Sequence, residues 1–106
     1  MNTAATRPFD RDTALRIARA FLPKHPLGNR WDYYYTLAKL RSDPLYPGVL
    51  QALRGSDAPV LDLGCGLGLL AHALRADGQH MAYRGVDNDA AKITRANKVA
   101  EKNALV

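Results

Sequence analysis

The stretch that decides the fold is Val60-Leu61-Asp62-Leu63-Gly64-Cys65-Gly66-Leu67-Gly68, near the middle of the 106-residue chain. Its first four residues are short and mostly apolar, which is typical of a buried parallel strand. Glycines at alternate positions then let the backbone turn sharply, because no Cβ stands in the way. Apolar residues at helical spacing follow and predict a helix that ends near residues 77–78.

The same order of elements repeats along the chain. Residues 81–86 are predicted to form a second strand, closed by Asp87. Asn88 or Asp89 is predicted to cap a further helix, with Ile93 and Ala100 on its apolar face. Strand–helix–strand–helix is the beginning of a doubly wound α/β sheet.

The residues before Pro59 show a different pattern, since apolar residues there recur at three- and four-residue steps. They predict a helix over 10–22, capped by Asp10 or Asp12. Further helices are predicted over 30–41 and 44–53, the last interrupted at Pro47-Gly48. We therefore expect two parts. Residues 1–57 form an N-terminal helical cap or lid, and residues 58–106 form the first half of an α/β domain that stops after its second helix.

Charge and composition narrow the function classes. The chain has 15 Lys and Arg against 10 Asp and Glu, and residues 1–57 carry a net +4 of the total +5. The basic residues alternate with apolar ones as on a solvated helix face, so nucleic-acid binding is disfavoured. Cys65 is the single cysteine, which excludes an intrachain disulfide and fits a reducing, cytoplasmic setting. No apolar run approaches the roughly 18 residues of a membrane span.

The glycine turn and Asp87 together indicate the kind of ligand. Asp87 lies 19 positions after Gly68, where an acidic side chain meets the hydroxyls of a bound ribose. The dinucleotide fingerprint fails, because its third glycine falls one place early and Leu69 stands in its position. Asp62 at the strand end would repel a pyrophosphate but attract an ammonium group. The turn therefore suits a nucleoside that carries an amino acid.

Residues 62–68, followed by Gly85-Val86-Asp87, resemble the first two motifs of class I S-adenosylmethionine-dependent methyltransferases. The resemblance covers about residues 59–104. Residues 28–40 are also faintly similar to the region ahead of this motif in methyltransferases of bacterial aryl-polyene pigment clusters. The resemblance implies an incomplete Rossmann-like fold and S-adenosylmethionine as cofactor. The methyl acceptor is unknown, and a small molecule is favoured.

The resemblance also implies roles for single positions. Gly64 and Gly66 would pass under the methionine part of the cofactor, Asp62 would face its ammonium group, Asp87 would accept from both ribose hydroxyls and Asn88 would lie beside the adenine. The full cofactor-binding set is Asp62, Leu63, Gly64, Cys65, Gly66, Gly68, Asp87 and Asn88. No catalytic residue is assigned. We expect the 106-residue chain alone to be inactive and to bind the cofactor weakly. Its incomplete sheet should either self-associate or leave the chain marginally stable.

Two other functions stay open, a non-catalytic cofactor-binding or assembly module and a nicotinamide-binding domain. Several residues have simpler interpretations than a chemical role. Cys65 is a small residue that fits between two glycines, and the scattered His25, His72 and His80 are expected on the surface or on helix faces, with no metal site. The aromatic cluster is interpreted as core packing of the cap, with a lid over the ligand as the alternative; it comprises Trp31, Tyr33, Tyr34, Tyr35 and Tyr46.

Overall fold

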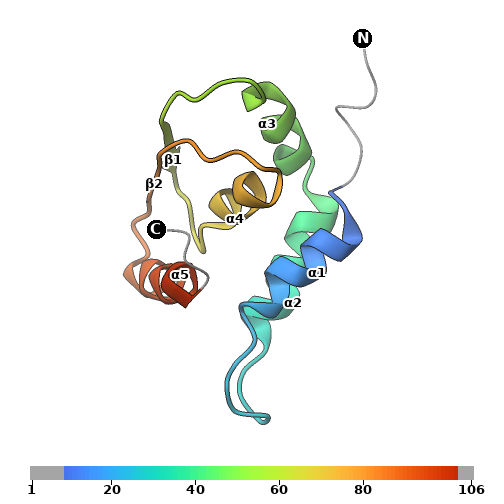
Figure 1. The fold of residues 1–106 in the computed structure, drawn as a ribbon. Coiled ribbons are helices and arrows are strands. Elements are labelled where there is room, and N and C mark those ends of the chain that lie inside the picture. The colour runs from blue at the N-terminus through green and yellow to red at the C-terminus, as the bar shows by residue number, and fades with distance from the viewer. Residues whose placement is uncertain (1–8, 103–106) are drawn as a thin grey trace. The chain divides into compact units, whose positions relative to one another are not determined.

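The structure is a computed structural model that describes residues 9–102, and it divides into two compact units, Met1–Ala52 and Leu53–Val106. In the described residues, five helices accompany one two-stranded parallel sheet (Figure 1). The order is three helices, then strand, helix, strand, helix. The predicted small α/β architecture is therefore confirmed in its element order.

In the first unit, helix α1 (Arg11–Arg19) packs against helix α2 (Trp31–Ser42). Asp10 caps α1 as predicted, because its carboxylate accepts a hydrogen bond from the Thr13 N–H at 3.0 Å. The helix ends three residues before the predicted boundary at residue 22. Residues 20–22 instead form tighter bonds to carbonyls three positions back, such as Phe21 N to Ala18 O at 2.9 Å.

Helix α3 (Leu45–Leu53) corrects the prediction of an interruption at Pro47-Gly48. Pro47 is the third residue of the helix, so its missing N–H falls in the first turn, where backbone N–H groups have no partner within the helix. Gly48 continues the helix, and its N–H bonds to the Pro44 carbonyl at 3.1 Å. A proline and a glycine in the first turn are therefore compatible with one continuous helix.

The expected core packing of the aromatic cluster holds only in part. Tyr46 is buried, but Trp31 is 69% exposed and Tyr34 61% exposed. Tyr34 makes an edge-to-face contact with Tyr33, whose ring centroid lies 4.9 Å away. Residues 33–35 are consecutive in α2, so they point in successive directions around the helix and cannot share one buried face.

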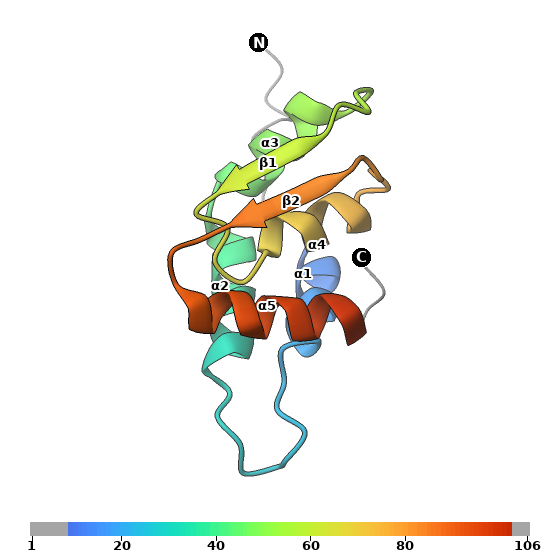
Figure 2. The same cartoon turned by 90° about the vertical axis from the view of Figure 1, so that its left-hand side faces the viewer.

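In the second unit, strand β1 (Val60–Leu63) is followed by helix α4 (Leu69–Ala76), strand β2 (Tyr83–Val86) and helix α5 (Ala90–Lys102). The two strands run parallel, as Figure 2 shows, and Asp62 stands opposite Gly85 in the register. Asp89 caps α5 through a bond from the Lys92 N–H to its carboxylate at 3.1 Å. The carboxyl ends of both strands therefore lie at one edge, beside the turn that leads into α4.

The burial of β1 differs from the prediction of a buried strand. Leu61 is 62% exposed and Leu63 74% exposed, whereas Val60 and Asp62 are half-buried. Alternate side chains point to opposite faces, and Leu61 and Leu63 share one face, which no described element of this unit covers. Parallel sheets are normally covered on both faces, so this sheet is incomplete within the described residues.

Candidate functional site

The glycine turn is tied to the end of β2 by three hydrogen bonds. The N–H groups of Gly64 and Cys65 both donate to the Val86 carbonyl, at 2.7 and 3.0 Å. The Gly66 N–H donates to the Asp87 carboxylate, Oδ2, at 2.8 Å. The turn is therefore not a free loop, because three successive backbone amides lock it against the neighbouring strand end.

Glycine is required in this turn by its backbone angles. Gly64, Gly66 and Gly68 have φ values of +73°, +55° and +76°, which L side chains rarely adopt. A Cβ built at Gly64 or Gly66 would meet no other atom within 4 Å. The space above the turn is therefore open, and a ligand can approach the main chain closely.

Asp87 is the central polar group of this edge. Its Oδ2 accepts from Gly66 and its Oδ1 accepts from the Asp89 N–H at 2.8 Å. The bonds from the backbone N–H groups of Asp89 and Gly66 lower the pKa of Asp87 below its usual value, so the side chain is a carboxylate at neutral pH. A carboxylate has about four positions for hydrogen-bond donors, so Asp87 can hold the turn and still accept from a ligand.

An open depression of about 440 Å³ lies over this edge and is lined by Gly64, Val86, Asp87 and Asn88. Three of these four residues belong to the predicted cofactor-binding set. Asn88 is exposed and directly follows Asp87, so its amide is accessible from the depression. The depression has an acidic side chain and exposed backbone but no Lys or Arg among its lining residues, which favours a cationic or neutral ligand over a phosphate.

The other predicted residues lie around the turn on different sides. Asp62 is half-buried, and its Oδ2 accepts a hydrogen bond of 2.6 Å from the hydroxyl of Tyr83. Leu63 points to the exposed face of the sheet. Cys65 and Gly68 line a second cavity and not the depression.

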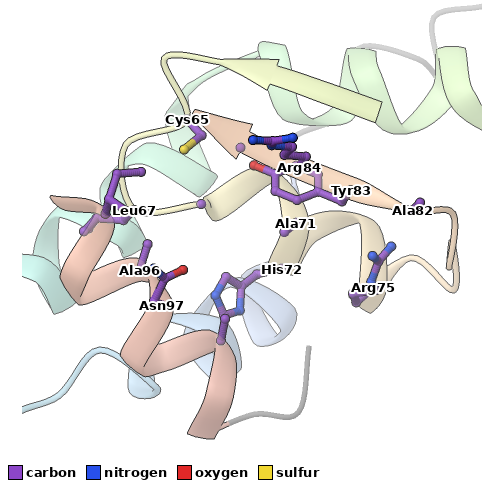
Figure 3. A pocket seen from close by; sticks show the side chains of 14 residues that line it. Cys65, Leu67, Ala71, His72, Arg75, Ala82, Tyr83, Arg84, Ala96 and Asn97 are labelled. Atoms are coloured by element: carbon purple, nitrogen blue, oxygen red, sulfur yellow. The ribbon is translucent and has the colours of Figure 1, made fainter. Parts of the chain in front are cut away.

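This second cavity, of about 560 Å³, lies between α4, α5 and β2 (Figure 3). Its walls are mostly apolar and include Leu67, Ala71, Ile93 and Ala96. The predicted apolar face of α5 is thus the face that lines the cavity, although α5 has no fully buried residue in its described part. The cavity is on the helix side of the sheet, whereas the depression is at the carboxyl ends of the strands.

His72 and Cys65 are among the side chains that line this cavity. His72 is buried on α4, on a helix face that packs inward, and burial lowers its pKa to about 4. Burial, together with the charges of Asp62 and Asp87, raises the pKa of the Cys65 thiol. A protonated thiol is a poor nucleophile, so these surroundings agree with the interpretation of Cys65 as a small structural residue.

Sequence reasoning missed Tyr83 as a residue of the site. From the sequence, Tyr83 is only one residue of a predicted strand, because the partner of its side chain depends on the register between the two strands. The register places Tyr83 opposite Val60 and Gly85 opposite Asp62 on the same face of the sheet. The available signal was Gly85 itself, since a glycine inside a strand often marks a place where another group approaches the backbone closely.

Two features of other protein classes are absent from residues 9–102. That part of the chain contains no group of three or more His, Cys, Asp or Glu side chains that could hold a metal ion. Among the same residues, no helix has the length and apolar character needed to cross a membrane.

The chain is an α/β protein whose glycine turn and Asp87 carboxylate lie at the carboxyl ends of two parallel strands. Open sheets of this kind bind ligands at the carboxyl ends of their strands. A family model described as a methyltransferase domain matches residues 54–106, half of the chain, and the chain belongs to this family. The resemblance to class I methyltransferases is thereby confirmed. Comparison with curated proteins and with solved structures gave no match.

Proposed function

We propose that the carboxyl edge of β1 and β2 binds S-adenosylmethionine and that the chain is the cofactor-binding part of a methyltransferase acting on a small molecule. The observation that carries the proposal is the double engagement of Asp87. One side chain holds the glycine turn through Gly66 and faces the depression with unused lone pairs. A ribose placed there would find a two-point acceptor directly beside an open main-chain surface.

The residues present fit the charge of this cofactor. S-adenosylmethionine carries a methyl group on a positively charged sulfur, together with an ammonium and a carboxylate. Asp62 and Asp87 supply two negative charges on either side of the turn, and the lowered pKa of Asp87 keeps it ionised at neutral pH. The start of α4 adds N–H groups and the positive end of a helix dipole, which suit the carboxylate. A pyrophosphate would instead meet two carboxylates.

The chain's own residues contribute binding and orientation in this proposal. Asp87 accepts from the ribose hydroxyls, Gly64 and Gly66 leave space for the methionine part, Asp62 faces the ammonium group and Asn88 lies beside the adenine. Methyl transfer depends mainly on holding the acceptor in line with the methyl group. No residue of the described chain is assigned to the acceptor, and the aryl-polyene type and a cytoplasmic location stay predictions.

The test is a titration of the chain with S-adenosylhomocysteine and with NAD in a calorimeter, repeated with Asp87→Ala. We expect binding of S-adenosylhomocysteine, none or weaker binding of NAD, and a loss of at least about tenfold in affinity for Asp87→Ala, since charge-assisted hydrogen bonds are lost. Asp57→Ala is the matched control, because it removes an exposed aspartate before β1. Preference for NAD, or an unchanged affinity in Asp87→Ala, would refute the proposal.

A further inference from the structure

Two side chains on the helix-facing side of the sheet form a hydrogen bond that the sequence motifs do not predict. The Tyr83 hydroxyl donates to Asp62 Oδ2 at 2.6 Å, so a residue of β2 holds a carboxylate of β1. Both side chains are half-buried, which limits competition by water. A charge-assisted hydrogen bond of this length is among the stronger kinds in proteins.

The strand register explains how Tyr83 reaches Asp62. Tyr83 is opposite Val60, and Asp62 is opposite Gly85, so the two are diagonal neighbours on one face. Because Gly85 has no side chain, the tyrosine ring can lean along the strand over it. A Cβ built at Gly85 would lie 3.0 Å from the Tyr83 hydroxyl oxygen. The absence of a side chain at Gly85 therefore creates the path for this hydrogen bond.

Cys65 closes the other side of the same space. The Cβ built at Gly85 would lie 2.6 Å from the Cys65 Sγ, so the thiol and the tyrosine hydroxyl both lie close above Gly85. Figure 3 shows the tyrosine hydroxyl on the side of the Tyr83 ring nearer Cys65. The Tyr83 hydroxyl is thus directed toward the glycine turn.

We infer that Tyr83 is a positioning residue for the amino-acid end of the cofactor, acting by holding the Asp62 carboxylate in place beside the turn. The inference rests on the proposed function. Asp62 has two oxygens, and Tyr83 occupies one position on Oδ2, which leaves Oδ1 and a second lone pair for an ammonium group. Fixing the carboxylate in advance lowers the entropy lost when the ligand binds.

A role in positioning predicts an effect on one end of the ligand only. S-adenosylhomocysteine has the ammonium group, whereas methylthioadenosine has the same nucleoside and sulfur without the amino acid. The hydrogen bond between Tyr83 and Asp62 should therefore influence the first ligand and not the second. The ratio of the two affinities isolates this effect, because a partly unfolded variant binds both ligands less in equal proportion.

The experiment measures both dissociation constants for the wild-type chain, Tyr83→Phe, Asp62→Ala and the double variant. For Tyr83→Phe we expect S-adenosylhomocysteine to bind about three- to tenfold more weakly, as for the loss of one hydrogen bond, with methylthioadenosine changed less than about twofold. In the Asp62→Ala background, Tyr83→Phe should leave the ratio unchanged. Tyr34→Phe is the matched control, since it removes the same hydroxyl from an exposed position on α2.

The possible outcomes separate this inference from the proposed function. An equal loss for both ligands in Tyr83→Phe, an unchanged ratio, or a further change of the ratio in the Asp62→Ala background would overturn the positioning role. Equal wild-type affinities for the two ligands would also overturn it, while the nucleoside site stands. A wild-type chain that binds neither ligand would refute the proposed function and, with it, the role of Tyr83.

Discussion

Replacing Gly85 on β2 by alanine should disrupt the glycine turn that follows β1, because the new methyl group would clash with Cys65 in that turn. The added Cβ would lie 2.6 Å from the Cys65 Sγ and 2.8 Å from the Cys65 Cβ. Non-bonded carbon atoms are most stable about 3.5–4.0 Å apart, so Cys65 must move by nearly an ångström. It cannot move freely, because its N–H is bonded to the Val86 carbonyl at 3.0 Å, between the similar bonds of Gly64 and Gly66.

The two contacts with Cys65 determine how far Gly85→Ala lowers the free energy of unfolding. Overpacking by one methyl group in a well-packed site costs typically 1–3 kcal/mol, and a clash with a Cβ belongs at the upper end because no rotamer change relieves it. We therefore expect Gly85→Ala to lower the free energy of unfolding by about 2–3 kcal/mol, measured by urea unfolding followed by circular dichroism. Affinity for S-adenosylhomocysteine should fall as well, since the turn is displaced.

One control variant and two rescue variants test the clash between Gly85→Ala and Cys65. Gly48→Ala on α3 adds a Cβ that meets nothing within 4 Å, so it should be neutral or stabilise by up to about 1 kcal/mol. Cys65→Ala removes only the contact with Sγ and should rescue Gly85→Ala in part. Cys65→Gly removes both contacts and should rescue it more fully. A Gly85→Ala variant as stable as the wild type would refute the packing derived for the turn.

Three further predictions concern His72, Cys65 and the chain as a whole. The pKa of His72 is about 4 in the folded chain and 6.5 ordinarily, so the unfolded chain binds the proton more readily. The free energy of unfolding should therefore fall by up to about 3 kcal/mol as the pH drops from 6.5 to 4. In unfolding measured against pH, His72→Gln should flatten this slope. The raised pKa of Cys65 predicts that iodoacetamide reacts with the native chain several-fold more slowly at pH 7.5 than with the urea-unfolded chain, and equal rates would contradict this. The chain alone should show no methyl transfer and should self-associate in sedimentation, because the described sheet has two strands and Leu61 and Leu63 are exposed; a monomer with turnover would contradict this.

The sequence predicted the features that depend on neighbouring residues. The turn needed glycines at positive φ, Asp10 and Asp89 are capping residues, and the order of strands and helices follows from local periodicity. It failed where the outcome depends on distant parts of the chain. Leu61 and Leu63 looked buried because apolar strands usually are, but burial requires a covering element. The contact between Tyr83 and Asp62 needs the register of two strands, which periodicity does not specify.

The helix α3 shows a different kind of limit. Pro47-Gly48 is a strong turn signal, and the outcome depended on where the helix begins. A bond from the Leu45 N–H to the Asp43 carboxylate, at 2.9 Å, fixes that beginning two residues before the proline. The missing N–H of Pro47 then falls in the first turn and costs the helix no hydrogen bond. A shift of the helix start by a few residues would have made the same proline a helix breaker.

The most direct test of the central claim is a titration of the isotope-labelled chain with S-adenosylhomocysteine, followed by the backbone amide signals in NMR. We expect saturable shifts at Gly64 and Asn88, which line the depression, and at Gly66, whose N–H is bonded to Asp87. Shifts at Ala96 and Asn97, in the cavity between α4 and α5, should be smaller. NAD at the same concentrations should shift the turn amides less. Shifts centred on Ala96 and Asn97, or none at the glycine turn, would contradict the assignment of the cofactor to the carboxyl edge of β1 and β2.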